Sequence, residues 1–194
     1  MTTLRRTLVL ALLCAPWWAR AQHRPVTVAG VRFERRAQVA GTELRLNGVG
    51  VRAVAWFKGY AAALYLSEPA TTAAQAVDLA GPKRLRMHML HAVPPAEFIK
   101  AFRKGVQRNA LPGEMPRLAE RMGRFEALIE AAGTVQPGDV VDMDLDPARG
   151  LLFSHNGRRI GEPIAGTDFF GALLRGFVGE RPYDKDLRAG LLGG

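Results

Sequence analysis

The residues of this chain that could act as nucleophiles or metal ligands do not form the patterns that such chemistry requires. Neither serine, Ser67 or Ser154, lies in the Gly-x-Ser-x-Gly turn that exposes a hydrolase nucleophile. His88 and His91 are three residues apart on a predicted strand, and that spacing sends side chains to opposite faces of a sheet. The sequence therefore predicts neither a serine triad nor a histidine metal site, and we expect the two histidines in the core or on the surface.

Three aspartates at alternate positions, Asp142, Asp144 and Asp146, resemble the start of a calcium-binding loop. Pro147, however, stands where that loop needs glycine, and Phe153 stands where it needs glutamate. A period of two is typical of a strand with one exposed face. We therefore expect these aspartates to form the solvated face of a strand, and we expect no metal.

No cofactor motif is present either. Gly48 and Gly50 lack the third glycine of a dinucleotide-binding turn, and they precede a strand instead of a helix. The single cysteine, Cys14, falls in an N-terminal segment that we expect to be removed, so we expect neither a disulfide nor a catalytic thiol. The sequence thus predicts a protein that works without a cofactor.

The first 21 residues have the three-part layout of a secretory signal peptide. A basic start precedes an apolar run at 7–15, and Ala19–Ala21 is a small-x-small cleavage site. The run is shorter than the roughly 20 apolar residues that span a bilayer. We therefore expect a cleaved signal peptide at 1–21, a periplasmic domain at 22–194 and no stable membrane anchor. A buried N-terminal helix or an uncleaved anchor is the alternative.

The charge of the chain is basic and dispersed. Loss of Arg5, Arg6 and Arg20 with the signal peptide would lower the formal net charge from +9 to +6. On the predicted helices, basic residues are interspersed with glutamates, and no aromatic stacking motif accompanies them. We therefore expect no nucleic-acid partner, whereas small anionic ligands remain open.

The spacing of apolar residues predicts the elements that must position any site. The expected strands are 26–33, 42–46, 49–66 with an interruption near 57–59, 83–93, 140–145, 151–155 and 158–161, with an Asn156-Gly157 hairpin turn before the last. The expected helices are 71–79, 95–111, 115–132, 168–178 and 184–192. Strands, then a helix pair, then strands again, without βαβ alternation, predict one α+β domain on an antiparallel sheet.

Two segments of the chain resemble the chalcone isomerase superfamily, most closely its short, signal-bearing bacterial branch. Leu46–Arg52 contains Gly-x-Gly-Val-Arg, and Lys58–Leu66 continues with Lys-x-Tyr. The closing segment Leu174–Glu180 is similar too, and the resemblance covers residues 26–194. It implies an open-faced β-sandwich, in which helices pack over one face of a large antiparallel sheet and leave a ligand cleft between them.

The resemblance also implies the head of a ligand site. The family's cleft arginine corresponds to Arg52, which holds a phenolate in the plant isomerases and a carboxylate in the related fatty-acid-binding branch. The plant enzymes have a threonine where this chain has Tyr60, and the fatty-acid-binding branch has a tyrosine there. The planar donors of a guanidinium suit either anion. Considered alone, Arg52 also fits an arginine at a strand end that pairs with a local carboxylate.

Other positions depart from the plant enzymes. Phe98 and Gly105 stand where those enzymes have an active-site tyrosine and asparagine, and Phe170 and Gly171 stand near their late serine or threonine. Apolar residues thus replace polar partners around the cleft, which counts against isomerase chemistry.

Two functions therefore remain in view. The first is non-catalytic binding of a fatty acid or another amphipathic anion, with Arg52 and Tyr60 at its polar end. The apolar tail of the ligand would contact Phe98, Phe102, Phe169, Phe170 and Leu174. The second is an intramolecular lyase, of the isomerase type, that acts on a phenolic substrate while Arg52 stabilises an oxyanion. A third possibility is a partner-binding role with a vestigial cleft.

Overall fold

The computed structural model describes residues 24–54 and 57–194, so the predicted signal peptide and the centre of the turn before Phe57 lie outside the described residues. The strands are β1 (Val26–Val28), β2 (Val31–Phe33), β3 (Arg36–Val39), β4 (Thr42–Val54), β5 (Phe57–Leu66), β6 (Lys83–Met89), β7 (Val140–Asp146), β8 (Gly150–His155) and β9 (Arg158–Arg159). The helices are α1 (Ala73–Asp78), α2 (Pro95–Asn109), α3 (Met115–Ala132), α4 (Thr167–Val178) and α5 (Lys185–Leu191).

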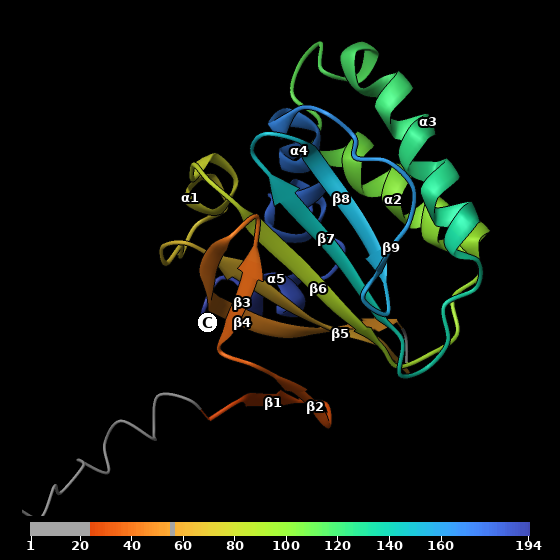
Figure 1. Cartoon of the computed structure of the whole chain (residues 1–194). Coiled ribbons are helices and arrows are strands. Elements are labelled where there is room, and N and C mark those ends of the chain that lie inside the picture. The colour runs from red at the N-terminus through yellow and green to blue at the C-terminus, as the bar shows by residue number, and fades with distance from the viewer. Residues whose placement is uncertain (1–23, 55–56) are drawn as a thin grey trace, which may run out of the picture.

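Seven strands form one curled antiparallel sheet in the order β3-β4-β5-β6-β7-β8-β9. The helix pair α2–α3 leaves the sheet after β6 and returns to β7, which pairs with β6 directly. Figure 1 shows the helices gathered on one side of this sheet. The structure confirms the predicted α+β fold. At the turn between β8 and β9, Asn156 and Gly157 both have positive φ, 51° and 75°, as an Asn-Gly hairpin requires.

The N-terminal strand segment differs from its prediction. Residues 26–33 form a separate two-stranded hairpin, because Ala29 and Gly30 have φ of 49° and 79° and reverse the chain between β1 and β2. The hairpin lies apart from the main sheet in Figure 1. Its apolar residues, among them Phe33, pack with Ala61, Ala63 and Tyr65 in a second, smaller core. The face of the sheet that the helices leave open is therefore partly covered.

The main core lies between the sheet and the helices. Its centre is an aromatic cluster of Phe102, Phe125, Phe153 and Phe169, whose edge-to-face contacts have ring centroids 4.8–6.3 Å apart. The α4 helix lies deep in this core, and its apolar side chains are almost fully buried. Among the helices of residues 24–54 and 57–194, none is long and apolar enough to cross a membrane.

The aspartates of β7 are buried, so the prediction of a solvated face is wrong. Asp142 and Asp144 are only 5% and 8% exposed. Arg86 donates two hydrogen bonds to Asp142, at 2.7 and 2.8 Å, and Arg84 donates two to Asp144, both at 2.6 Å. Alternation shows that residues share a face but not whether another element covers it, and here β3 curls toward β6 and β7. Asp146 is also buried, at 9% exposed.

The inner face of β4 carries two glycines and an arginine at alternate positions, Gly48, Gly50 and Arg52. The glycines leave bare backbone on which α5 lies. A Cβ on Gly48 would overlap the carbonyl oxygen of Gly190, and one on Gly50 would lie 2.8 Å from that of Leu187. Only glycine permits so close an approach, so the motif that precedes Arg52 is a docking surface for α5.

Polar contacts hold α5 along β4. Asn47, at a bulge before the first glycine, donates to the carbonyl oxygen of Leu191 at 2.7 Å. At the other end, the Asp184 carboxylate caps α5 by accepting from the amides of Asp186 and Leu187, and it also accepts from the Ala53 amide at 3.2 Å. The start of α5 is thereby fixed beside the strand position that carries Arg52.

We expect Gly48→Ala to lower the free energy of unfolding by about 1–3 kcal/mol or more, because the added methyl group must push α5 off β4. Gly59→Ala on the neighbouring strand is a suitable control, since its Cβ would make only an ordinary 3.7 Å contact. Urea denaturation followed by circular dichroism measures both. Equal midpoints for Gly48→Ala and the parent would contradict the close contact.

Candidate functional site

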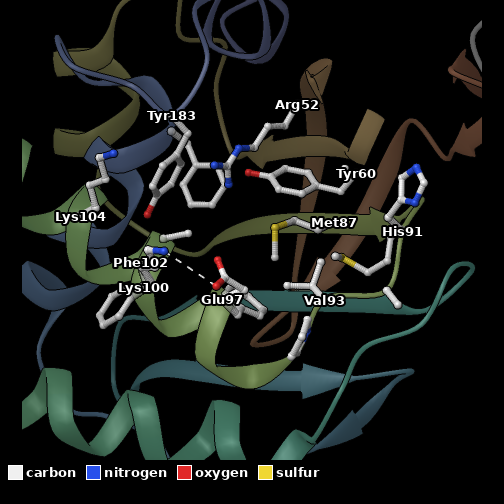
Figure 2. A pocket seen from close by; sticks show the side chains of 17 residues that line it. Arg52, Tyr60, Met87, His91, Val93, Glu97, Lys100, Phe102, Lys104 and Tyr183 are labelled. Atoms are coloured by element: carbon white, nitrogen blue, oxygen red, sulfur yellow. Dashed lines mark ion pairs between the residues drawn. The ribbon is translucent and has the colours of Figure 1, made fainter. Parts of the chain in front are cut away.

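A cavity of about 370 Å³ lies between the sheet and α2, within the size range of small-ligand sites. One end is polar and is formed by Arg52, Tyr60 and Tyr183 (Figure 2). Its walls are apolar and include Met87, Met89, Val93, Phe98, Phe102 and Phe177. The cavity therefore has one charged end, and its other walls are apolar.

Arg52 and Tyr60 come from the two strands of the β4–β5 hairpin. They are direct cross-strand partners, so their side chains lie on the same face of the sheet. Gly59 is the extra residue of a bulge next to this pair, and its carbonyl oxygen accepts from the amides of Leu90 and His91. The bulge therefore also ties the hairpin to the segment that follows β6 and forms part of the cavity.

Tyr183 completes the polar end from the loop between α4 and α5. The guanidinium carbon of Arg52 lies 5.2 Å from the centroid of the Tyr183 ring and 5.8 Å from that of Tyr60. Figure 2 shows the guanidinium between the two phenol rings. Tyr60 points its hydroxyl at the guanidinium and is hydrogen-bonded to it, so the two tyrosines hold Arg52 from different sides.

The electrostatics of this end favour an anion. Burial raises the pKa of Tyr60 to about 12, although the neighbouring Arg52 opposes the rise. Burial also raises the pKa of Tyr183. Both hydroxyls are therefore neutral near pH 7, and that of Tyr60 can donate a hydrogen bond. Arg52 has no carboxylate within ion-pairing distance in the part of the chain that the structure describes.

The mouth of the cavity carries further charge on α2. Lys100 and Lys104 both line it and are exposed, and Glu97 approaches Lys100 at 3.8 Å in a solvated ion pair. His91 lies on the opposite rim (Figure 2). The exposed lysines add to the positive potential of the entrance, although water and salt screen them.

The predicted site residues fall into two groups. Arg52, Tyr60, Phe98 and Phe102 all line the cavity. Phe170 does not line it, and it is 1% exposed in the main core. The same holds for the other predicted tail residues of α4, Phe169 and Leu174. A role of any of these residues in ligand binding stays a prediction.

Sequence reasoning missed Tyr183, Met87 and Met89. The methionines alternate on β6 as ordinary core residues do, so nothing in their pattern distinguished them. Tyr183 did leave a signal, because Gly105 and Gly176 interrupt two helices where they pack against its ring. A glycine inside a helix has a cost of about 1 kcal/mol and often marks a close contact.

The arrangement can bind and orient an anion, and it can stabilise negative charge on an oxygen. The neutral phenol of Tyr60 and the guanidinium of Arg52 are both donors at neutral pH, whereas the Tyr183 hydroxyl is packed against Gly105 and Gly176. In residues 24–54 and 57–194, no group of three or more histidine, cysteine, aspartate or glutamate side chains could hold a metal ion. The site thus joins a cluster of hydrogen-bond donors to an apolar cavity.

The model of the chalcone isomerase-like family matches residues 25–193 of this chain. Among solved structures, a fatty-acid binding protein of Arabidopsis thaliana is similar, with a TM-score of 0.70 and 16% sequence identity. The match covers 87% of this chain and 96% of the plant chain. At this identity the likeness establishes the fold alone. No curated protein sequence matches the chain.

We expect Phe102→Ala to lower the free energy of unfolding by about 3–5 kcal/mol, as truncation of a core phenylalanine does. Phe102 is 2% exposed and contacts Phe125 and Phe169. Phe98→Ala should have a clearly smaller effect, because Phe98 is only partly buried and faces the cavity. Urea denaturation compares the two variants. Equal losses would assign Phe98 to the core instead of the cavity wall.

Proposed function

The chain belongs to the chalcone isomerase-like family, and from that premise we propose that it is a binding protein for a fatty acid or a similar amphipathic anion. In this proposal Arg52 and Tyr60 receive the charged head group beside the Tyr183 ring, and the tail lies against Met87, Phe98 and the other apolar walls. The protein binds its ligand and makes or breaks no covalent bond.

One observation carries the proposal: the guanidinium of Arg52 lies at the end of an apolar cavity and has no ion pair among the described residues. Arg52 is only partly buried and its neighbour Tyr60 is neutral, so an anion at this end of the cavity would be the first charge to balance it. Asp184 is close, but its carboxylate already accepts hydrogen bonds from the amides of Ala53, Asp186 and Leu187. A carboxylate from a ligand would supply the missing partner, and it matches the paired donors of the guanidinium.

The lining of the cavity supports an apolar tail as the rest of the ligand. Methionine and aromatic side chains make up most of the apolar walls, and methionine in particular adapts to flexible ligands. The similar plant structure is described as a fatty-acid binding protein, which agrees with this ligand class. The lysines at the mouth would attract an anionic ligand to the entrance.

Arg52→Ala should weaken the binding of decanoate by roughly 2–5 kcal/mol, the range for loss of one partner of a buried charged contact. Tyr60→Phe should weaken it by about 1–3 kcal/mol, since one hydrogen bond to a charged group is lost. Arg52→Lys should fall between Arg52→Ala and the parent, because lysine keeps the charge but not the paired donors. Isothermal titration calorimetry measures all four proteins.

Arg45→Ala is a matched control, since Arg45 is an exposed arginine of the same strand and does not line the cavity. It should bind decanoate as the parent does. If Arg52→Ala also binds decanoate as the parent does, Arg52 is not part of the ligand site. Turnover of a chalcone should be measured in parallel by absorbance. Turnover by the parent that is lost in Arg52→Ala would replace the binding function with the lyase function.

We also propose that the protein acts after export, as a member of the signal-bearing bacterial branch. The three-part N-terminus supports this, with its apolar run at 7–15 and its cleavage site at Ala19–Ala21. N-terminal sequencing of protein from fractionated cells should find Gln22 as the first residue, in the periplasmic fraction. Protein that begins at Met1 in the cytoplasmic fraction would contradict export.

A further inference from the structure

We propose that the exposed side of α2 docks the protein on a bilayer surface with anionic head groups, so that a ligand passes between the bilayer and the cavity by contact. The inference rests on the proposed binding function for the identity of the ligand, whereas the docking itself needs no ligand. Two features of α2 support it, the charge of its exposed side and the position of that side at the cavity mouth.

All the charged side chains of α2 lie on its exposed side. The buried residues of the helix are Phe102, Gly105 and Val106, which face the core. The exposed charged residues are Glu97, Lys100, Arg103, Lys104 and Arg108. Their spacing of three or four residues places them in one stripe along the helix. Four cations and one anion give this stripe a net charge of +3.

Two of these four cations form no ion pair within residues 24–54 and 57–194. Glu126 of α3 accepts two hydrogen bonds from Arg103, at 2.5 and 2.6 Å, and Glu97 approaches Lys100 only loosely, at 3.8 Å. The unpaired cations are Lys104 and Arg108, one turn apart. Their charge is therefore available to an anionic surface.

The stripe lies where the cavity reaches the surface. Lys100 and Lys104 line the cavity, and both side chains are exposed (Figure 2). The wall behind them is apolar and includes Phe98, Ala101 and Phe102. A basic rim around an apolar opening fits a bilayer, in which anionic head groups cover apolar chains. An acidic protein would match the charge of the rim, but a bilayer also holds amphipathic anions of the kind that the cavity is proposed to bind.

The basic stripe is held rigidly by the helices and the loop around it. The paired hydrogen bonds between Arg103 and Glu126 join α2 to α3. At the end of α2, Asn109 donates to the carbonyl oxygen of Arg181 at 2.9 Å and accepts from the Arg181 amide at 3.0 Å. Arg175 of α4 donates to the Asn109 carbonyl oxygen at 3.0 Å. The cations of the stripe can therefore meet a flat surface together, without an ordering step that would weaken the contact.

The test measures sedimentation of the protein, as its host produces it and without added ligand, with lipid vesicles. The vesicles contain phosphatidylcholine alone or two parts of it to one part of phosphatidylglycerol. The parent should bind the anionic vesicles at least tenfold more tightly than the neutral ones, and salt should reduce this preference, because it screens exposed charges. Equal binding to both kinds of vesicle would overturn the inference.

The double variant Lys104→Gln/Arg108→Gln should bind the anionic vesicles at least tenfold more weakly than the parent, since each cation near such a surface contributes roughly a factor of five. Arg117→Gln/Arg124→Gln is the matched control. It removes the same charge from exposed positions of α3 that line neither the cavity nor the groove between α2 and α3. It should bind within twofold of the parent. Unchanged binding in the first variant, or an equal loss in the control, would overturn the assignment to α2.

Delivery by contact is tested with a fluorescently labelled fatty acid, which is transferred from the protein to anionic vesicles in a stopped-flow instrument. The transfer rate constant should rise with vesicle concentration in the parent and in the control, and it should stay constant in Lys104→Gln/Arg108→Gln. A constant rate in all three proteins would overturn delivery by contact. Vesicle binding without fatty-acid binding would contradict the proposed function and uphold the docking surface, whereas decanoate binding without vesicle binding would do the reverse.

Discussion

The close contact between α5 and the bare backbone of β4 is the constraint on which the site depends. Gly48 and Gly50 share a strand face with Arg52, and the absence of side chains on the glycines lets α5 lie directly on the sheet. The arginine extends beyond the end of that helix. Since the helix begins where it does, its capping residue reaches Ala53 and the preceding tyrosine lies against the guanidinium. The two glycines thus have a structural role. They fix α5 so that the residues at its start lie beside Arg52, two positions after Gly50.

Arginines on the two faces of the sheet have different neighbours, and the difference bears on function. On the face away from the helices, Arg84 and Arg86 each bind an aspartate of β7 through two hydrogen bonds. Such pairs satisfy their charges within the fold. On the helix-covered face, Arg52 has two aromatic rings for neighbours and no carboxylate among the described residues. All three arginines are partly buried, but only Arg84 and Arg86 are paired with carboxylates, whereas Arg52 faces the cavity.

The order of elements could be predicted because it follows from local pattern, and the resemblance to the chalcone isomerase superfamily identified Arg52 and Tyr60. Alternation, helical spacing and the Asn-Gly turn are encoded within a few residues, and so is a cross-strand pair in a hairpin. The burial of Asp142 and the role of Tyr183 could not be predicted in this way. The first depends on a strand about 100 residues earlier that covers the sheet, and the second on glycines in two distant helices. Phe170 shows the same limit: helical spacing identifies an inward-facing residue but cannot tell the core from a cavity wall.

The central claim is that Arg52 receives the head group of an amphipathic anion, and a crystal structure of the protein with decanoate tests it most directly. The carboxylate should lie within hydrogen-bonding distance of the guanidinium and of the Tyr60 hydroxyl, beside the Tyr183 ring. The tail should contact Met87 and Phe98. A carboxylate bound to the lysines of the mouth, or a ligand outside the cavity with Arg52 untouched, would contradict the account.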